Sequence, residues 1–329
     1  MSTEASGWPF VSVIIPTYRR YYVTLDTVDE VLRQDYLAFE LIVVDQNPRW
    51  PEDCHARLRQ LKNHPALTWI FLDEPGVVRA RNVAVSHSKG EVLLFVDDDV
   101  ILQDPHFIRK HAENYVSSDI DTVTAYELTR SNEDLTVDIE KLKGIRDFLS
   151  KNSPTPTRPW SGKNPLQDVL SFPRTLLERY EVCSFCTCNG SIRRSSFYDL
   201  GGFDANYIGN SYGDDYDLAI RARQHGMRMI YDPLPSLLHL QSPTGGLRIS
   251  DRGNTFSERD RAISAWIFVL RYFRFGMVGH LLWAHLLRKT VLVKSNLVHP
   301  WRQLKAWGGF AAAFPRALIA VIKGPTRGV

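Results

Sequence analysis

The sequence predicts an open α/β sheet, mostly parallel and flanked by helices, followed by a C-terminal helical extension that is basic and amphipathic. Two observations carry this prediction. Short apolar runs end at residues 15, 44, 72 and 96, at intervals of 29, 28 and 24 residues, and each interval has room for one helix. From residue 259 onward, long aliphatic and aromatic stretches alternate with basic residues instead.

The four predicted strands cover residues 11–15, 41–44, 67–72 and 92–96. Ligands of parallel sheets bind beyond the carboxyl ends of the strands, so the residues that follow each run are candidates for a binding site. All four ends are polar and can converge on one ligand. They are Pro16, Thr17 and Tyr18 after the first run, Asp45 after the second, Asp73 to Gly76 after the third, and Asp97, Asp98 and Asp99 after the fourth.

The aspartate triplet is the strongest of these signals. Three adjacent carboxylates repel one another, which predicts a cation among them, and hard oxygen ligands favour Mg2+ or Mn2+. The alternative is a solvated acidic turn. A helix is expected between Gly76 and Gly90, and because Arg79 and Arg81 cannot share one of its faces, at most one of them reaches the ligand. Arg81 is the preferred candidate.

Residues 127–180 are irregular and contain a proline-rich run at 153–159, which predicts a surface loop or lid. A strand is expected at 182–193, followed by a tight turn at 201–204. The three cysteines in this part of the chain suggest a metal site, but a closed zinc site needs a fourth ligand. Buried small apolar residues are therefore the preferred interpretation of Cys183, Cys186 and Cys188.

Residues 213–226 predict a short helix that starts with acids and ends with basic residues, as the helix dipole favours. Asp214 and Asp215 fit this structural explanation, but two adjacent acids also suit a site where one remains a free base. A strand is expected at 227–231. His239 is either a core histidine or a ligand, and the loop with Gly245, Gly246 and Arg248 can close over phosphates.

The charge is unevenly distributed, with a net −8 over residues 1–258 and +11 over residues 259–329. The longest stretch there without an ionic side chain is 275–287, 13 residues, so no transmembrane helix is predicted. Amphipathic helices rich in Trp, Leu and Arg predict contact with an anionic membrane surface; packing on the catalytic region or in an oligomer is the alternative. The short polar start and the few cysteines predict a cytoplasmic protein.

Six motifs together resemble the family 2 glycosyltransferases of the GT-A fold, over about residues 10–240. In order and spacing they are the segment 11–20, Asp45, the segment 76–82, Asp97 to Asp99, the turn 201–204 and the segment 213–218. The resemblance implies an inverting transfer of a sugar from a nucleotide-diphosphate sugar, usually a UDP-sugar, to a hydroxyl acceptor. It also implies a divalent cation, Mn2+ or Mg2+.

The resemblance further implies roles for individual residues. Thr17, Asp45 and Arg81 would hold the nucleotide, with Asp97 toward the uridine and Arg248 on the diphosphate. Asp99 and His239 would bind the metal. Asp215 would be the catalytic base, with Asp214 as the second candidate. Pro16, Tyr18 and Asp98 are assigned to the nucleotide pocket by their place at the strand ends, and Asp98 has no separate role.

The functional hypothesis is a metal-dependent inverting glycosyltransferase on the inner face of the cell membrane, making a glycolipid or a cell-surface polysaccharide. The chain is expected to divide into a catalytic domain, residues 1–258, and a membrane-facing region, residues 259–329. One alternative is a sugar nucleotidyltransferase, which needs a glycine-rich loop where Pro16, Thr17 and Tyr18 stand. Another is a non-catalytic membrane-associated scaffold. Nucleic-acid binding is not expected, because the basic residues are interleaved with aliphatic runs.

Overall fold

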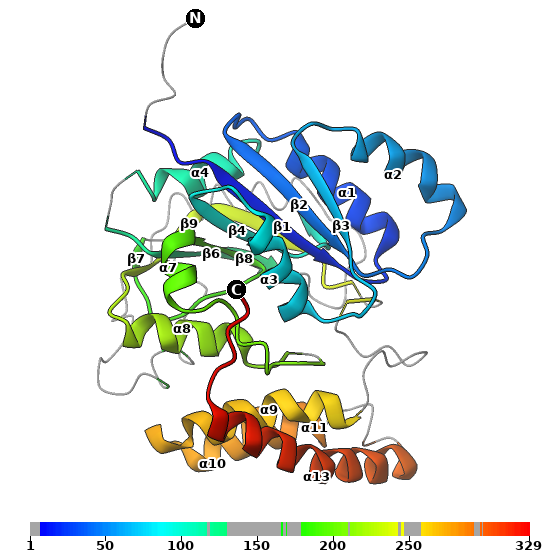
Figure 1. Ribbon diagram of the computed structural model, residues 1–329, viewed down its shortest axis with the longest axis vertical. Coiled ribbons are helices and arrows are strands. Elements are labelled where there is room, and N and C mark those ends of the chain that lie inside the picture. The colour runs from blue at the N-terminus through cyan, green and yellow to red at the C-terminus, as the bar shows by residue number, and fades with distance from the viewer. Residues whose placement is uncertain are drawn as a thin grey trace, which may run out of the picture.

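The structure, a computed structural model, describes residues 7–116, 119–129, 166, 169, 179–209, 211–242, 245–246, 258–292, 297 and 299–329. In these residues a nine-stranded mixed sheet has helices on both faces, and the C-terminal helices form a further layer on one side (Figure 1). The strand order is β3-β2-β1-β4-β8-β6-β9-β5, with β7 paired to β9. The predicted α/β sheet with a helical C-terminal extension is confirmed.

The first half of the sheet is the predicted parallel unit. It consists of β1 (Val11–Thr17), β2 (Phe39–Asp45), β3 (Leu67–Phe71) and β4 (Val92–Val96), all paired in parallel. Every residue of β1 and β4 is buried, because helices cover both faces, and this explains their uninterrupted apolar runs. Parallel pairing brings the four carboxyl ends to one edge of the sheet.

Two apolar clusters fill the space between the sheet and its helices. On one face lie α3 (Val77–His87), α7 (Arg194–Asp199) and α8 (Asp214–Gln224). On the other lie α1 (Tyr21–Leu32), η1 (Glu52–Cys54), α2 (His55–Lys62) and α4 (Phe107–Glu113). The helix expected up to Gly90 ends earlier, at His87.

The second half of the sheet contains antiparallel pairs. Strand β8 (Asn189–Arg193) runs antiparallel to both β4 and β6 (Thr122–Thr129), and β5 (Val100–Ile101) and β7 (Tyr180–Glu181) run antiparallel to β9. The strand expected at 182–193 was too long, because residues 182–188 form a loop that turns back on the sheet. A Cβ at Gly190 would lie 2.3 Å from the carbonyl oxygen of Cys186, so this close turn requires glycine.

Strand β9 (Met229–His239) is longer than the predicted strand at 227–231 and runs through two prolines. It pairs in parallel with β6, but the register shifts between Ala125, which pairs with Asp232, and Glu127, which pairs with Leu237. Pro233 and Pro235 fall inside this irregularity, where no ladder hydrogen bond is required of them. The strand therefore continues to His239 and delivers it to the edge where β4 ends.

The C-terminal layer contains α9 (Glu258–Tyr272), η2 (Phe273–Phe275), α10 (Val278–His280), the π-helical segment η3 (Leu281–Leu287), α11 (Arg288–Thr290) and α13 (Pro300–Lys323). Among the described helices, α13 is the one that could cross a membrane by length and composition. No such helix was predicted from the sequence, because the criterion required a long run without any ionic side chain. Basic residues spread along α13 interrupt every such run, so that requirement was too strict. The two-domain division at residue 258 stays a prediction, and most of the predicted lid lies outside the described residues.

A buried ion cluster joins the C-terminal layer to the rest of the fold. The Arg271 guanidinium of α9 lies 2.7 Å from Asp217 on α8 and 2.7 Å from Asp204 in the turn at 201–204. The hydroxyl of Tyr272 donates to the same Asp217 oxygen at 2.7 Å. Although burial opposes it, Arg221 and Arg271 lower the pKa of Asp217. Both carboxylates thus depend on Arg271 for compensation away from water.

We expect Arg271→Ala to lower the free energy of unfolding by about 3–5 kcal/mol, because it leaves two buried carboxylates with less positive charge. Urea unfolding followed by circular dichroism measures this change. Arg57→Ala is the control: Arg57 forms an exposed pair with Asp26 at 2.6 Å, and its loss is expected to change the free energy of unfolding by about 0–1 kcal/mol. Equal effects of the two substitutions would contradict the role of the cluster.

Candidate active site

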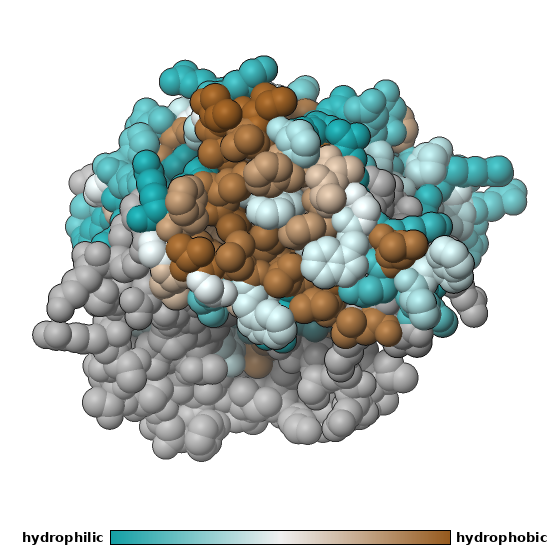
Figure 2. Space-filling view, turned by 90° about the horizontal axis from the view of Figure 1, so that it is seen from below, coloured by the Kyte–Doolittle hydropathy of each residue, from teal (hydrophilic) through white to brown (hydrophobic). Residues whose placement is uncertain are grey.

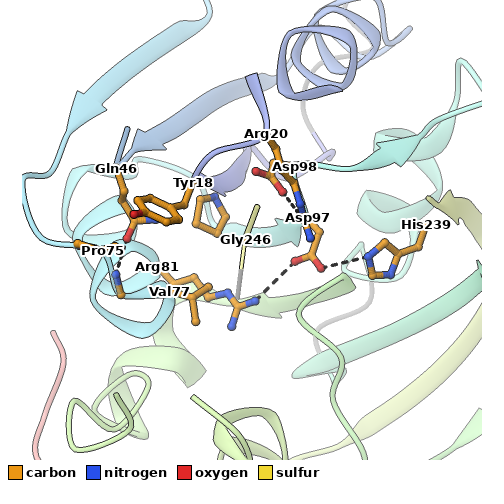
Figure 3. Close-up of a pocket in the computed structure, with 12 residues that line it drawn as sticks. Tyr18, Arg20, Gln46, Pro75, Val77, Arg81, Asp97, Asp98, His239 and Gly246 are labelled. Carbon is orange, nitrogen blue, oxygen red and sulfur yellow. Dashed lines mark hydrogen bonds and ion pairs between the residues drawn. The ribbon is translucent and has the colours of Figure 1, made fainter. Parts of the chain in front are cut away.

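A cavity of about 150 Å³ opens at the edge where the parallel strands end (Figure 3). Among the residues predicted for the site, it brings together Pro16, Tyr18, Arg81, Asp97, Asp98 and His239. The rest of the wall comes from the predicted strand-end and loop segments, with Arg20, Gln46, Pro75, Gly76 and Gly246, and from Val77, which the sequence did not single out. Tyr18, Gln46 and Pro75 stand at one end of the cavity, and Asp97, Asp98 and His239 at the other (Figure 3).

The repulsion within the aspartate triplet is offset by side chains of the chain itself. Arg20, just after β1, donates from Nη1 to Asp98 at 2.6 Å and to Asp99 at 2.7 Å. Asp99 is fully buried and also accepts from the backbone N–H of Ser242 at 2.7 Å. Burial raises the pKa of Asp98. Against the effect of burial, hydrogen bonding to His239 and the charge of Arg20 lower the pKa of Asp99.

His239 is oriented by a carboxylate on the neighbouring strand. Its Nδ1 lies 2.5 Å from Glu127 Oε1, while its Nε2 faces Asp99 at 3.2 Å and Asp97 at 3.7 Å. Burial lowers the pKa of His239, but the bonds to Asp99 and Glu127 outweigh it and raise the pKa to about 10. Metal-binding histidines commonly have one ring nitrogen bonded to a carboxylate, as Nδ1 is to Glu127, while the other nitrogen faces the metal. Two further carboxylates, Asp97 and Asp99, lie beside Nε2, so His239, Asp97 and Asp99 together fit a divalent cation.

Arg81, in the wall of the cavity, links Asp97 to two acids at the start of α8 that do not themselves line the cavity. It lies 3.7 Å from Asp97 at the end of β4, 2.9 Å from Asp214 and 3.9 Å from Asp215 at the start of α8. Arg79, two residues earlier, instead pairs with Glu74 at the exposed surface. The helix geometry of α3 separates the two arginines, and the side chain directed at the site is that of Arg81.

The two acids of α8 differ in their partners. Burial raises the pKa of Asp215 and raises that of Asp214 well above its usual value. Asp215 also accepts a hydrogen bond from the Thr187 hydroxyl at 2.9 Å, which stabilises its ionised form. Of this pair, Asp215 is therefore the better candidate for the ionised carboxylate. Thr187 lies in the loop that was predicted to be strand, so the sequence offered no signal for this contact.

Two predicted nucleotide contacts do not line the cavity. The Asp45 carboxylate is buried and accepts from Trp50 Nε1 at 2.7 Å and from Trp69 Nε1 at 3.0 Å. The hydroxyl of Thr17 lies 2.7 Å from that of Thr24. Gln46, the residue after Asp45, reaches the cavity instead. Arg248 lies outside the described residues, and its role stays a prediction.

The geometry matches known proteins over much of the chain. The model of the family described as "Glycosyl transferase family 2" matches residues 12–201. The chain belongs to this family. It is a glycosyltransferase, and the match includes all of β1 but its first residue, the aspartate triplet, β8 and Gly201, the first residue of the turn at 201–204.

Relatives from bacteria match part of the chain. The O-antigen biosynthesis protein RfbC of Myxococcus xanthus is 27% identical over 242 residues, which are 72% of this chain and 18% of RfbC. The uncharacterized glycosyltransferase YfnE of Bacillus subtilis is 25% identical over 248 residues, 66% of this chain and 61% of YfnE. The chain thus spans less than two thirds of the length of these relatives.

Solved glycosyltransferases share the GT-A fold of this family 2 chain. The mannosyltransferase PcManGT from Pyrobaculum calidifontis, in complex with GDP-Man and Mn2+, superposes with a TM-score of 0.52 at 20% identity and covers 94% of this chain and 78% of its own. TarS 1–349 from S. aureus, in complex with UDP-GlcNAc, superposes with a TM-score of 0.55 at 15% identity, over 94% and 83% of the two chains. At these identities the likeness establishes the fold.

We expect Glu127→Gln to weaken Mn2+ binding by about 10- to 100-fold, because His239 loses the carboxylate that orients its ring. Isothermal titration calorimetry measures the dissociation constant. Glu181→Gln is the control, since Glu181 pairs with Arg228 at the surface at 3.0 Å, away from the site. Unchanged Mn2+ affinity in Glu127→Gln would contradict the positioning role of Glu127.

Proposed function

We propose that this family 2 chain transfers a sugar from a UDP-sugar to a hydroxyl acceptor, with inversion at the anomeric carbon. The observation that carries the proposal is the bridge made by Arg81. It joins a metal-binding set, Asp97 with His239, to a partly buried acid pair, Asp214 and Asp215. A cation site and a base joined by one arginine of the cavity wall are parts that such a transfer requires.

The two ends of the cavity suit the two parts of a nucleotide diphosphate. Tyr18 offers an aromatic ring and Gln46 an amide at one end, which suit stacking and hydrogen bonding of a base. Arg81, Asp97 and His239 lie toward the other end, where charge must be compensated. The volume of 150 Å³ is smaller than the roughly 300 Å³ or more of common ligand sites, so the donor extends beyond it through the open side.

The metal site is proposed to consist of Asp97, Asp99 and His239, with Mn2+ or Mg2+ as the ion. A bound divalent cation would stabilise the negative charge of the leaving diphosphate. Glu127 holds the His239 ring so that Nε2 faces both aspartates, and Arg20 keeps Asp98 and Asp99 in place. Arg81 supplies a further positive charge beside Asp97.

Asp215 is proposed as the base that takes the proton from the acceptor hydroxyl. Its carboxylate is held by Thr187 and is the more exposed of the pair, at 28% against 12% for Asp214. Burial raises the pKa of Asp215, and a raised pKa is what a carboxylate needs to act as a general base. Asp214 then carries the salt bridge with Arg81 at 2.9 Å.

The acceptor is proposed to be lipid-linked, in glycolipid or cell-surface polysaccharide synthesis on the inner face of the cell membrane. The name of the relative RfbC, an O-antigen biosynthesis protein, supports a cell-surface product. The apolar outer side of the C-terminal helices supports the proposal that the enzyme acts at a membrane surface. The sugar transferred depends on residues around the open side of the cavity.

We expect Asp215→Asn to lower kcat by about 100-fold or more while Mn2+-dependent UDP binding stays within about threefold, since the amide cannot take a proton but keeps the shape of the side chain. Release of UDP from a panel of UDP-sugars measures turnover, and a thermal-shift assay with UDP and Mn2+ measures binding. Full turnover in Asp215→Asn would refute the assignment of the base.

We expect Thr187→Val to shift the acid limb of the pH profile of kcat/KM to higher pH. The base must be ionised, so activity rises with pH through its pKa. Loss of the hydrogen bond destabilises the Asp215 carboxylate and raises that pKa further. Thr68→Val, at an exposed position of β3, is the control and should leave the profile unchanged. A downward shift of the limb would contradict this role of Thr187.

A further inference from the structure

A concentrated apolar surface covers the outer side of the C-terminal helices. Of the 18 large apolar side chains that are exposed in the described part of the chain, 12 lie between residues 273 and 322. Figure 2 shows this side, with apolar side chains gathered in one area and polar ones around it. Seven of the 12 belong to α13: Trp301, Leu304, Trp307, Phe314, Leu318, Ile319 and Ile322. Apolar exposure of this extent marks a docking surface.

The opposite side of helix α13 packs against the rest of the protein. Ala306, Ala313, Ala317 and Ala320 are buried, and the ring of Trp266 on α9 packs on Phe310 at 4.8 Å. Small residues let α13 approach α9 closely, while the large side chains face away. Only 22% of the apolar window of α13 is buried, so α13 is not a core helix.

The charge around this surface is of one sign. From residue 261 to 329 the sequence contains no Asp or Glu and 11 Lys and Arg. Among the basic side chains, Arg288, Lys289, Lys305, Arg316 and Lys323 are exposed. An apolar face with a basic rim is complementary to anionic lipid headgroups above acyl chains, whereas a second copy of the same surface would bring like charges together.

Residues 324–329, which follow α13, limit how the helix can be oriented in a membrane. Residues 324–329 return to the catalytic region, beside α3 and the turn at 201–204 (Figure 1). The N–H of Gly328 donates to Gly201 O at 3.0 Å, and that of Thr326 to Asp204 Oδ1 at 2.9 Å. A Cβ at Gly328 would lie 1.8 Å from Asn82 Nδ2, so this docking is close. The C-terminal end of α13 is therefore held beside the catalytic region, and the packing of its buried alanines along α9 keeps the rest of the helix on the same side.

We propose that α13 and residues 278–287 form an interfacial anchor that lies in the plane of an anionic bilayer and does not cross it. An anionic bilayer as the partner extends the proposed function, because a lipid-linked acceptor would reach the enzyme from the plane of the membrane. The inference itself rests on the described surface and the return of residues 324–329.

Co-sedimentation of the full chain with vesicles of phosphatidylglycerol and phosphatidylcholine tests the surface. The variant Leu304→Glu with Ile322→Glu replaces side chains 63% and 75% exposed, and we expect its vesicle affinity to fall by about tenfold or more. The matched control is Leu37→Glu with Leu234→Glu, at sites 99% and 58% exposed on the catalytic region, which should bind as the wild type does.

Equal binding of the two double variants would overturn the proposal, and so would a lipid-free dimer that does not bind vesicles. UDP binding with Mn2+, measured on the same preparations, reports the donor site separately. Vesicle binding can therefore fail while the proposed transfer stands.

Labelling of vesicle-bound protein with a membrane-impermeant maleimide tests the orientation. Arg302→Cys and Lys323→Cys put a thiol near each end of α13, and the four native cysteines are buried. An in-plane helix leaves both new thiols reactive from the outside. Protection of one of them until the vesicles are lysed would show a membrane-crossing helix and overturn the proposal.

A second inference concerns Cys188, a thiol beside the proposed metal site. All four cysteines are buried and none forms a disulfide. Cys188, however, has its Sγ 3.4 Å from His239 Nδ1. One ligand atom from each of Asp97, Cys188 and His239 lies within 4.8 Å of the other two. The sequence separates these residues, so no spacing of cysteines could reveal the group.

The geometry also points to a second way of binding metal at this site, in which Asp97, Cys188 and His239 hold Zn2+ in preference to Mn2+. Ligand atoms around tetrahedral zinc lie about 3.3–3.6 Å apart, so the 3.7 Å between Asp97 Oδ2 and His239 Nε2 nearly fits. The sulfur of Cys188 lies within 4.8 Å of the other two ligand atoms and has to approach by up to about 1.5 Å. The thiol proton leaves to solvent as the sulfur–metal bond forms. Hard Mn2+ instead prefers oxygen ligands and leaves the thiol aside.

Cobalt substitution tests this second inference on the full chain. A thiolate ligand gives Co2+ a sulfur-to-metal charge-transfer absorption in the near ultraviolet, which we expect in the wild type and in Cys183→Ser, an equally buried control. The band should be lost in Cys188→Ser and in Cys188→Ala, whose Zn2+ affinity should fall by about tenfold or more while Mn2+ affinity is unchanged. No band in the wild type, or a band that persists in both variants, would refute it without affecting the proposed transfer.

Discussion

The compensation of charge at the end of β4 organises the site. Asp97, Asp98 and Asp99 emerge from a fully buried strand, and their repulsion has to be offset where little water reaches them. The positive groups come from distant parts of the chain: Arg20 from the end of β1, Arg81 from α3 and His239 from the end of β9. Satisfying this one constraint brings both halves of the sheet to a common edge.

The same ion pairs divide the work between the three aspartates. Arg20 holds Asp98 and Asp99 from behind, so Asp98, which had no assignable role in the sequence, anchors the loop after β1 to the loop after β4. Asp97 remains partly exposed between Arg81 and His239. Arg20 and Asp98 thus hold the two loops in place before a donor binds.

A second buried cluster connects catalysis to the C-terminal layer. Asp217 lies on α8 two residues after the proposed base, Asp215, and is held by Arg271 and Tyr272 of α9. The helix that carries the acid pair is therefore fixed by the helix on which α13 packs. In physical terms the C-terminal helices form one wall of the catalytic fold as well as an outer surface.

The sequence by itself determined the parallel half of the sheet, the polar strand ends, Arg81 over Arg79, and the family. These follow from local patterns, because apolar runs, helix periodicity and motif order are written in consecutive residues. Only the tertiary structure decided the partners of Asp45, the contacts of Glu127, Thr187 and Cys188, the passage of β9 through its prolines, and the return of residues 324–329 to the turn at 201–204. Such contacts join residues far apart in the chain, and pairing across a sheet or closure of a loop leaves no periodic trace from which sequence reasoning can recover them.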